Sequence, residues 1–125
     1  RARMGEWGRA VITIEKLISF GADVNEGLKR CMNNEAFYLR LVGMEMGDRN
    51  FDALKDAVEA GDPKAAFEAA HALKGALGNL SLTPIYEPVA LLTEELRGAS
   101  SMPDVGELCQ RVFSAYQQLK SLSEE

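Results

Sequence analysis

Three prolines stand at positions typical of helix openings in the second half of the chain. They occur in Asp62-Pro63, Thr83-Pro84 and Met102-Pro103. Proline is tolerated in the first turn of an α-helix, where its missing N–H would have no partner, and Asp before it can accept hydrogen bonds from the free N–H groups. Between these openings apolar residues recur at helical spacing, and we find no convincing alternation typical of a strand. The sequence therefore predicts an all-α protein.

Start and stop signals also divide the first half of the chain. Thr13 and Asp23 can cap short helices, the latter with Glu26 three residues on, and glycines at 21 and 61 can end helices. The helices expected here run over residues 13–20, 23–32, 34–47 and 50–61. Within the third of them, the apolar stripe expected to face the core consists of Phe37, Tyr38, Leu41 and Met44.

The remaining helices are expected over residues 62–80, 83–98 and from Met102-Pro103 onward. Long helices joined by loops of a few residues pack as antiparallel neighbours. We therefore expect an antiparallel up-and-down four-helix bundle with short N-terminal helices. Residues 13–125 form this domain, and residues 1–12 are expected to be an N-terminal arm, part of which could stem from the expression vector.

The bulk properties exclude several classes of protein. The chain has 125 residues, of which 46% are hydrophobic and 26% charged, as in one globular domain. A formal net charge of −5 without a basic cluster argues against nucleic-acid binding. No apolar run approaches the roughly 20 residues of a membrane span, and no signal peptide is apparent, so we expect a cytoplasmic protein without membrane contact.

Cysteine and histidine content limits the chemistry further. Cys31 and Cys109 are far apart and have no CxxC partner, so we expect two buried free thiols and no metal site. The single histidine, His71, excludes two-histidine metal centres, including bundle metalloenzymes that need Glu-x-x-His repeats on facing helices. We accordingly predict no metal and no cofactor in this chain.

The segment around His71 carries the most specific signal. At about 100° per residue, His71 lies opposite a broad apolar face, so its imidazole should point to solvent. Gly75 at i+4 and Gly78 at i+7 each cost about 1 kcal/mol relative to alanine inside a helix, so they need a reason. We interpret both as leaving the surface beside the ring bare for a partner, with Lys74 at i+3 as counter-charge. The core face is expected to comprise Ala66, Ala69, Ala70, Leu73, Ala76, Leu77 and Leu80.

An exposed imidazole suits phosphoryl carriage, because a pKa near 6.5 leaves an unprotonated nitrogen at neutral pH. The chain contains no P-loop, no glycine-rich kinase loop and no carboxylate cluster built for Mg²⁺. We therefore expect a phosphocarrier, not an enzyme, whose partner supplies the Mg²⁺ and the acidic half of the reaction.

The motif Ala70-His71-Ala72-Leu73-Lys74-Gly75 resembles the HxLKG signature of the histidine-containing phosphotransfer (HPt) family of two-component phosphorelays. The likeness extends over about residues 22 to 120, through Gly61-Asp62, Gly78-Asn79-Leu80, Gly27-Leu28-Lys29-Arg30 and Tyr38-Leu39-Arg40-Leu41. It implies a four-helix bundle, phosphorylation of His71 at Nε2, and support from Lys74 and Gly75. The partners implied are receiver domains of response regulators, with a hybrid sensor histidine kinase as a further candidate. We expect the chain itself to be a monomer.

Three more residues are candidates for the site. Phe67 could pack under the first short helix or serve as an exposed docking aromatic, and Glu68 could hold the second ring nitrogen or be solvated. Thr93 stands where many family members have a glutamine near the histidine, a departure that puts this contact in doubt. The competing function is a helical-bundle interaction module that binds receiver domains without being phosphorylated. The sequence leaves open whether the domain is free-standing or part of a longer protein.

Overall fold

The structure is a computed structural model that describes residues 12–124, a part of the chain that contains helices and no strand. The all-α prediction is therefore confirmed. The predicted arm at residues 1–12 lies outside the described residues except for Ile12. The helices are α1 (Ile14–Phe20), α2 (Val24–Arg30), α3 (Glu35–Glu45), α4 (Asn50–Glu59), α5 (Pro63–Asn79), α6 (Thr83–Leu96) and α7 (Gly106–Leu122).

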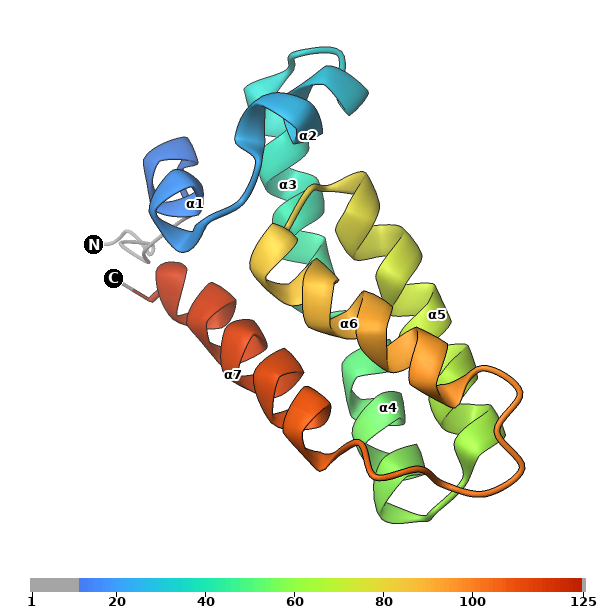
Figure 1. Cartoon of the computed structure of the whole chain (residues 1–125). Helices are drawn as coiled ribbons and strands as arrows, with labels where there is room; N and C mark the ends of the chain where they lie inside the picture. The colour runs from blue at the N-terminus through green and yellow to red at the C-terminus, as the bar shows by residue number, and fades with distance from the viewer. Residues whose placement is uncertain (1–11, 125) are drawn as a thin grey trace.

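The long helices form the predicted bundle (Figure 1). Helix α5 packs most extensively against α4 and α6, and α6 packs against α7. Successive members run in opposite directions, with α3 leading into α4, so the antiparallel up-and-down arrangement is confirmed. The short α1 packs against α7 and α2. At the end of α7, the Leu122 carbonyl accepts a hydrogen bond from the Lys16 ammonium at 2.9 Å.

Most predicted helix starts carry the expected caps. The side chains of Thr13, Asp23 and Asp62 accept hydrogen bonds from backbone N–H groups three residues on, at 3.1 to 3.2 Å. The last helix differs from the prediction, because it begins at Gly106 and not at Met102-Pro103. Val105 is buried in the core at 3% exposure, and the Asp104 side chain accepts from the Gly106 N–H. Packing of this loop thus delays the helix by one turn.

The core-facing side of α3 also differs from the prediction. Tyr38 is buried as expected, but it shares its face with Val42 and Glu45, whereas Phe37 is 39% and Met44 66% exposed. The reason is tertiary: α2 and the turn after α5 cover the Tyr38 side of α3, where the Tyr38 hydroxyl donates to the Leu80 carbonyl at 2.8 Å. The predicted stripe is therefore wrong for Phe37 and Met44, and Leu41 is half-buried.

Candidate functional site

Helix α5 presents His71 to solvent. Its opposite face is buried through Ala66, Ala69, Ala70, Leu73 and Leu77, and Leu80 is buried directly after the helix. Ala76, expected on this face, is half-buried. The imidazole of His71 is exposed, as the helical projection predicted. The burial of one face fixes the helix, and the opposite face remains accessible to a partner.

A groove lies beside the imidazole, and we call it the His71 groove. It brings Lys74 and Gly75 together with His71, as the sequence predicted. A Cβ built on Gly75 would meet no atom within 4 Å, so this part of the groove is bare. The remaining lining residues are Asp23, which caps the start of α2, Arg30 from α2, Gly78 and Asn79 from α5, Ser81 from the turn, and Thr83, Tyr86 and Glu87 from α6.

Gly78 lines the same groove, and the structure shows a packing reason for it that was not inferred from sequence. A Cβ at this position would lie 2.9 Å from Cε1 and 3.3 Å from Cδ1 of the Tyr86 ring. The Tyr86 ring on α6 thus lies directly against the α5 backbone. Gly78 therefore serves close helix packing, a reason that the sequence interpretation did not include, and its role in leaving the surface bare for a partner stays a prediction.

Phe67 stacks on the imidazole one turn before it. The ring centroids of Phe67 and His71 are 5.5 Å apart, with the planes 16° from parallel. The guanidinium of Arg97 at the end of α6 lies over the Phe67 ring, 5.1 Å from its centroid. Phe67 is half-buried against the core. Helix α1 packs against α7 and α2, and Figure 1 shows it beside the C-terminal end of α7, at the opposite end of the bundle from the start of α5. Of the two alternatives for Phe67, packing under the first short helix is therefore wrong.

An ion-pair chain runs along the same side of the site. Arg97 donates to both carboxylate oxygens of Glu94, at 3.3 Å from Nε and 3.0 Å from Nη2. The Lys74 ammonium lies 4.0 Å from Glu94 Oε2. These charges lower the pKa of the Glu94 carboxyl, chiefly through Arg97, with smaller effects from Lys74 and His71. A carboxylate therefore stands within electrostatic reach of the imidazole.

The other two sequence candidates take no part in these contacts. Glu68 is exposed, and within residues 12–124 its carboxylate forms no hydrogen bond with His71. Thr93 is completely buried, and its hydroxyl donates to the Val89 carbonyl of its own helix at 2.7 Å. The residue that α6 does bring to the site is its neighbour, Glu94.

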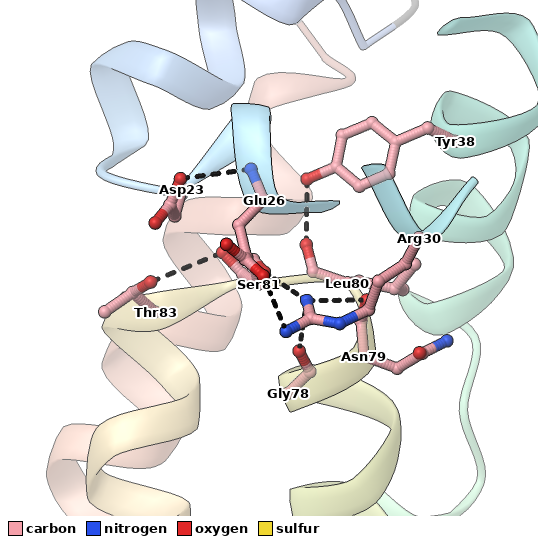
Figure 2. A network of polar contacts seen from close by, with 9 residues as sticks. All are labelled: Asp23, Glu26, Arg30, Tyr38, Gly78, Asn79, Leu80, Ser81 and Thr83. Atoms are coloured by element: carbon pink, nitrogen blue, oxygen red, sulfur yellow. Dashed lines mark hydrogen bonds and ion pairs between the residues drawn. The ribbon is translucent and has the colours of Figure 1, made fainter. Parts of the chain in front are cut away.

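Helix α2 holds the C-terminal end of α5 (Figure 2). The Arg30 guanidinium donates to the carbonyls of Gly78 at 3.2 Å and Asn79 at 3.4 Å, and to the Ser81 hydroxyl at 2.7 Å. The last carbonyls of a helix lack intrahelical partners and carry partial negative charge, which a cation stabilises. Arg30 therefore caps α5 from another helix and forms one wall of the His71 groove.

Gly27 allows α2 to come this close. A Cβ there would lie 2.6 Å from Cε1 of Tyr38 and 2.9 Å from the Leu80 carbonyl oxygen. The Tyr38 hydroxyl donates to that same carbonyl (Figure 2), and burial raises the pKa of Tyr38 to about 12. Gly27, Arg30 and Tyr38 all belong to motifs that carried the resemblance.

Three further features of the described residues concern metal ligands, thiols and apolar helices. Residues 12–124 contain no group of three or more His, Cys, Asp or Glu side chains placed to hold a metal ion. Both cysteines are free; Cys31 is buried as expected, but Cys109 is only half-buried. None of the described helices combines the length and apolar character needed to cross a bilayer.

Comparison with known families agrees with the fold. The family model described as Hpt domain matches residues 42–122. Comparisons with curated proteins and with solved structures find no match. Because the match covers well over half of the chain, the chain belongs to the histidine-containing phosphotransfer domain family. Its members are phosphocarriers of two-component phosphorelays that interact with receiver domains, and they are not kinases.

Sequence reasoning missed Glu94 and Arg97. Their i, i+3 spacing on a predicted helix is a recognisable ion-pair signal. Their proximity to His71 and Phe67 depends on how α6 lies against α5, which no local pattern specifies.

Proposed function

We propose that this chain carries a phosphoryl group on His71, accepting it from and donating it to the aspartate of a receiver domain. The observation that carries the proposal is the exposed imidazole in a groove that also holds Lys74 and the bare backbone at Gly75. A receiver active site must bring its own loops close to the ring, and the missing side chain at Gly75 provides the room.

The transfer needs only a nucleophile and charge neutralisation. The lone pair of the unprotonated Nε2 attacks phosphorus of the aspartyl phosphate, the N–P bond forms, and the P–O bond breaks as the aspartate carboxylate leaves. The reverse step returns the phosphoryl group to a carboxylate and the electron pair to the ring nitrogen. Lys74 lies one helical turn from the ring, where its ammonium can offset charge on the phosphoryl oxygens.

The partner provides the remaining machinery. Phosphoryl transfer is accelerated mainly by in-line positioning and by metal ions on the phosphoryl oxygens. We expect Mg²⁺ to be bound by the receiver domain. A hybrid sensor histidine kinase is a further candidate partner upstream. A monomer of this chain is sufficient for the exchange, since every residue invoked belongs to one copy.

Exchange with a phosphorylated receiver domain tests the proposal. Radiolabelled receiver is mixed with wild type, His71→Gln and Glu68→Gln, the last being a control that alters an exposed neighbour on α5. We expect acid-labile, base-stable label on wild type and on Glu68→Gln, and none on His71→Gln. Equal labelling of His71→Gln would exclude His71 as the carrier. Binding of the receiver without labelling of wild type would support the interaction module instead.

A further inference from the structure

Glu94 forms ion pairs with both Lys74 and Arg97 beside the imidazole. We propose that Glu94 is a positioning residue that lowers the stability of the phosphorylated state of His71 by competing for Lys74. The inference rests on the proposed function and deepens it, because it concerns how readily the phosphoryl group leaves again.

The two side chains converge from neighbouring helices. Side chains of an α-helix lean toward its N-terminus, and α5 and α6 run in opposite directions. Lys74 therefore leans along α5 toward the level of His71, and Glu94 leans along α6 toward Lys74. Their charged atoms end 4.0 Å apart, and Glu94 is close enough for the charge of His71 to influence its titration.

The two cations hold Glu94 unequally. Arg97 forms two hydrogen bonds with the carboxylate, at 3.0 and 3.3 Å, whereas Lys74 approaches a single oxygen at the limit of an ion pair. A two-point arginine–carboxylate contact fixes geometry, and one lysine contact does not. Arg97 is itself placed over the ring of Phe67, which stacks on His71. Lys74 is therefore the partner that can leave.

Phosphorylation of His71 changes the competition for this lysine. A phosphoryl group brings close to two negative charges to the ring, and Lys74 must turn away from Glu94 to neutralise them. The Glu94 carboxylate remains in place on Arg97, where it competes for the ammonium. Removing its charge frees Lys74 and should make phosphohistidine more stable relative to aspartyl phosphate.

The test is the position of the phosphoryl equilibrium with a receiver domain. Glu94→Gln keeps the shape of the side chain and removes the charge, and should raise the ratio of phosphohistidine to aspartyl phosphate about threefold, as a screened charge at this range would. Glu95→Gln makes the same charge change one residue away, at an exposed position with no ion pair to Lys74 in the described residues, and should leave the ratio unchanged. An unchanged ratio in Glu94→Gln would overturn the inference.

A double-mutant cycle with Lys74→Ala tests the route. If Glu94 acts through Lys74, then Glu94→Gln should change the ratio little in the Lys74→Ala background. A threefold change that persists there would overturn the inference, since Glu94 would then act on the phosphoryl group directly.

Loading from phosphoramidate separates this inference from the proposed function. This small donor labels exposed imidazoles without a receiver, so the rate of phosphoryl loss can be followed in each variant. Slower loss from Glu94→Gln than from wild type and Glu95→Gln supports the inference even if the receiver tested is the wrong partner. Equal rates in all three, with His71 labelled, contradict the inference and leave the carrier role of His71 intact.

Discussion

The C-terminal end of α5 and the middle of the same helix differ in their contacts with the rest of the molecule. The carbonyls at the C-terminal end accept hydrogen bonds from the Arg30 guanidinium. Directly after the helix, the Leu80 carbonyl accepts a hydrogen bond from the Tyr38 hydroxyl. The middle of the helix exposes His71 to solvent. Beside it, a Cβ added to Gly75 would meet nothing within 4 Å. The fold thus fixes the helix at one end and leaves its reactive surface uncovered.

Glycines show the same contrast at atomic scale. Gly27 is required at the held end, because a Cβ there would overlap Tyr38 and the Leu80 carbonyl. Gly75 meets no such demand among the described residues, which supports the proposal that it leaves room for a partner. Under the proposed function, a helix with both features would hold its nucleophile in a fixed position while the surface around it stays open.

The largest effect should come from filling the close contact at Gly27. Gly27→Ala places Cβ 2.6 Å from a buried ring, and the gain in helix propensity does not offset the overlap. We expect a loss of about 3 kcal/mol in the free energy of unfolding. Urea denaturation measures it. A stability equal to wild type would show that α2 does not hold α5 in this way.

A pH dependence should appear at the same end of α5. Glu45 is buried at 8% exposure beside a cavity lined also by Ala76, Asn79 and Leu80, and its Oε2 has no hydrogen-bond partner among residues 12–124. Burial, with a smaller effect of Asp48, raises the pKa of this carboxyl to about 8. Its contribution to stability is therefore complete below about pH 4.5, the usual value, and is lost as the pH rises through 8.

Glu45→Gln checks this dependence. The neutral amide has no charge to bury, so the variant should exceed wild type in stability by about 2 kcal/mol at pH 8.5 and match it near pH 5. Urea denaturation at both pH values gives the comparison. The same difference at both pH values would mean that the Glu45 carboxyl does not titrate between them.

Removing one hydroxyl should have a smaller effect at the held end. Tyr38→Phe keeps the ring and leaves the Leu80 carbonyl without this donor, which should cost about 1.5 kcal/mol. Thermal unfolding followed by circular dichroism measures it. Phosphoryl exchange per folded molecule should stay at the wild-type rate, because the ring of His71 is untouched. A large drop would contradict the proposed separation between the C-terminal end of α5 and its middle.

The smallest change in stability should occur at the open surface. Gly75→Ala adds a methyl group into empty space and should stabilise the helix by up to about 1 kcal/mol. Gly43→Ala on α3 is the matched control, since a Cβ there also meets nothing within 4 Å. Both variants should be more stable than wild type, but only Gly75→Ala should slow exchange with a receiver. Equal exchange rates in the two variants would remove the functional reason for Gly75.

Local signals predicted much of this molecule. Capping residues such as Thr13 and Asp62 specify helix starts through contacts three residues away, and the exposure of His71 follows from helical geometry alone. The features that were missed depend on contacts between distant segments. The buried side of α3, the packing reason for Gly78 and the approach of Glu94 to Lys74 are all decided by how one helix lies on another.

The central claim is that one exposed imidazole carries the phosphoryl group, and the most direct measurement is to locate that group. The protein is loaded by a phosphorylated receiver, digested at neutral pH and mapped by mass spectrometry. The account predicts phosphate on the fragment that contains His71, lost after brief acid treatment and retained in base. Phosphate on any fragment without His71, or a modification that survives acid, would contradict it.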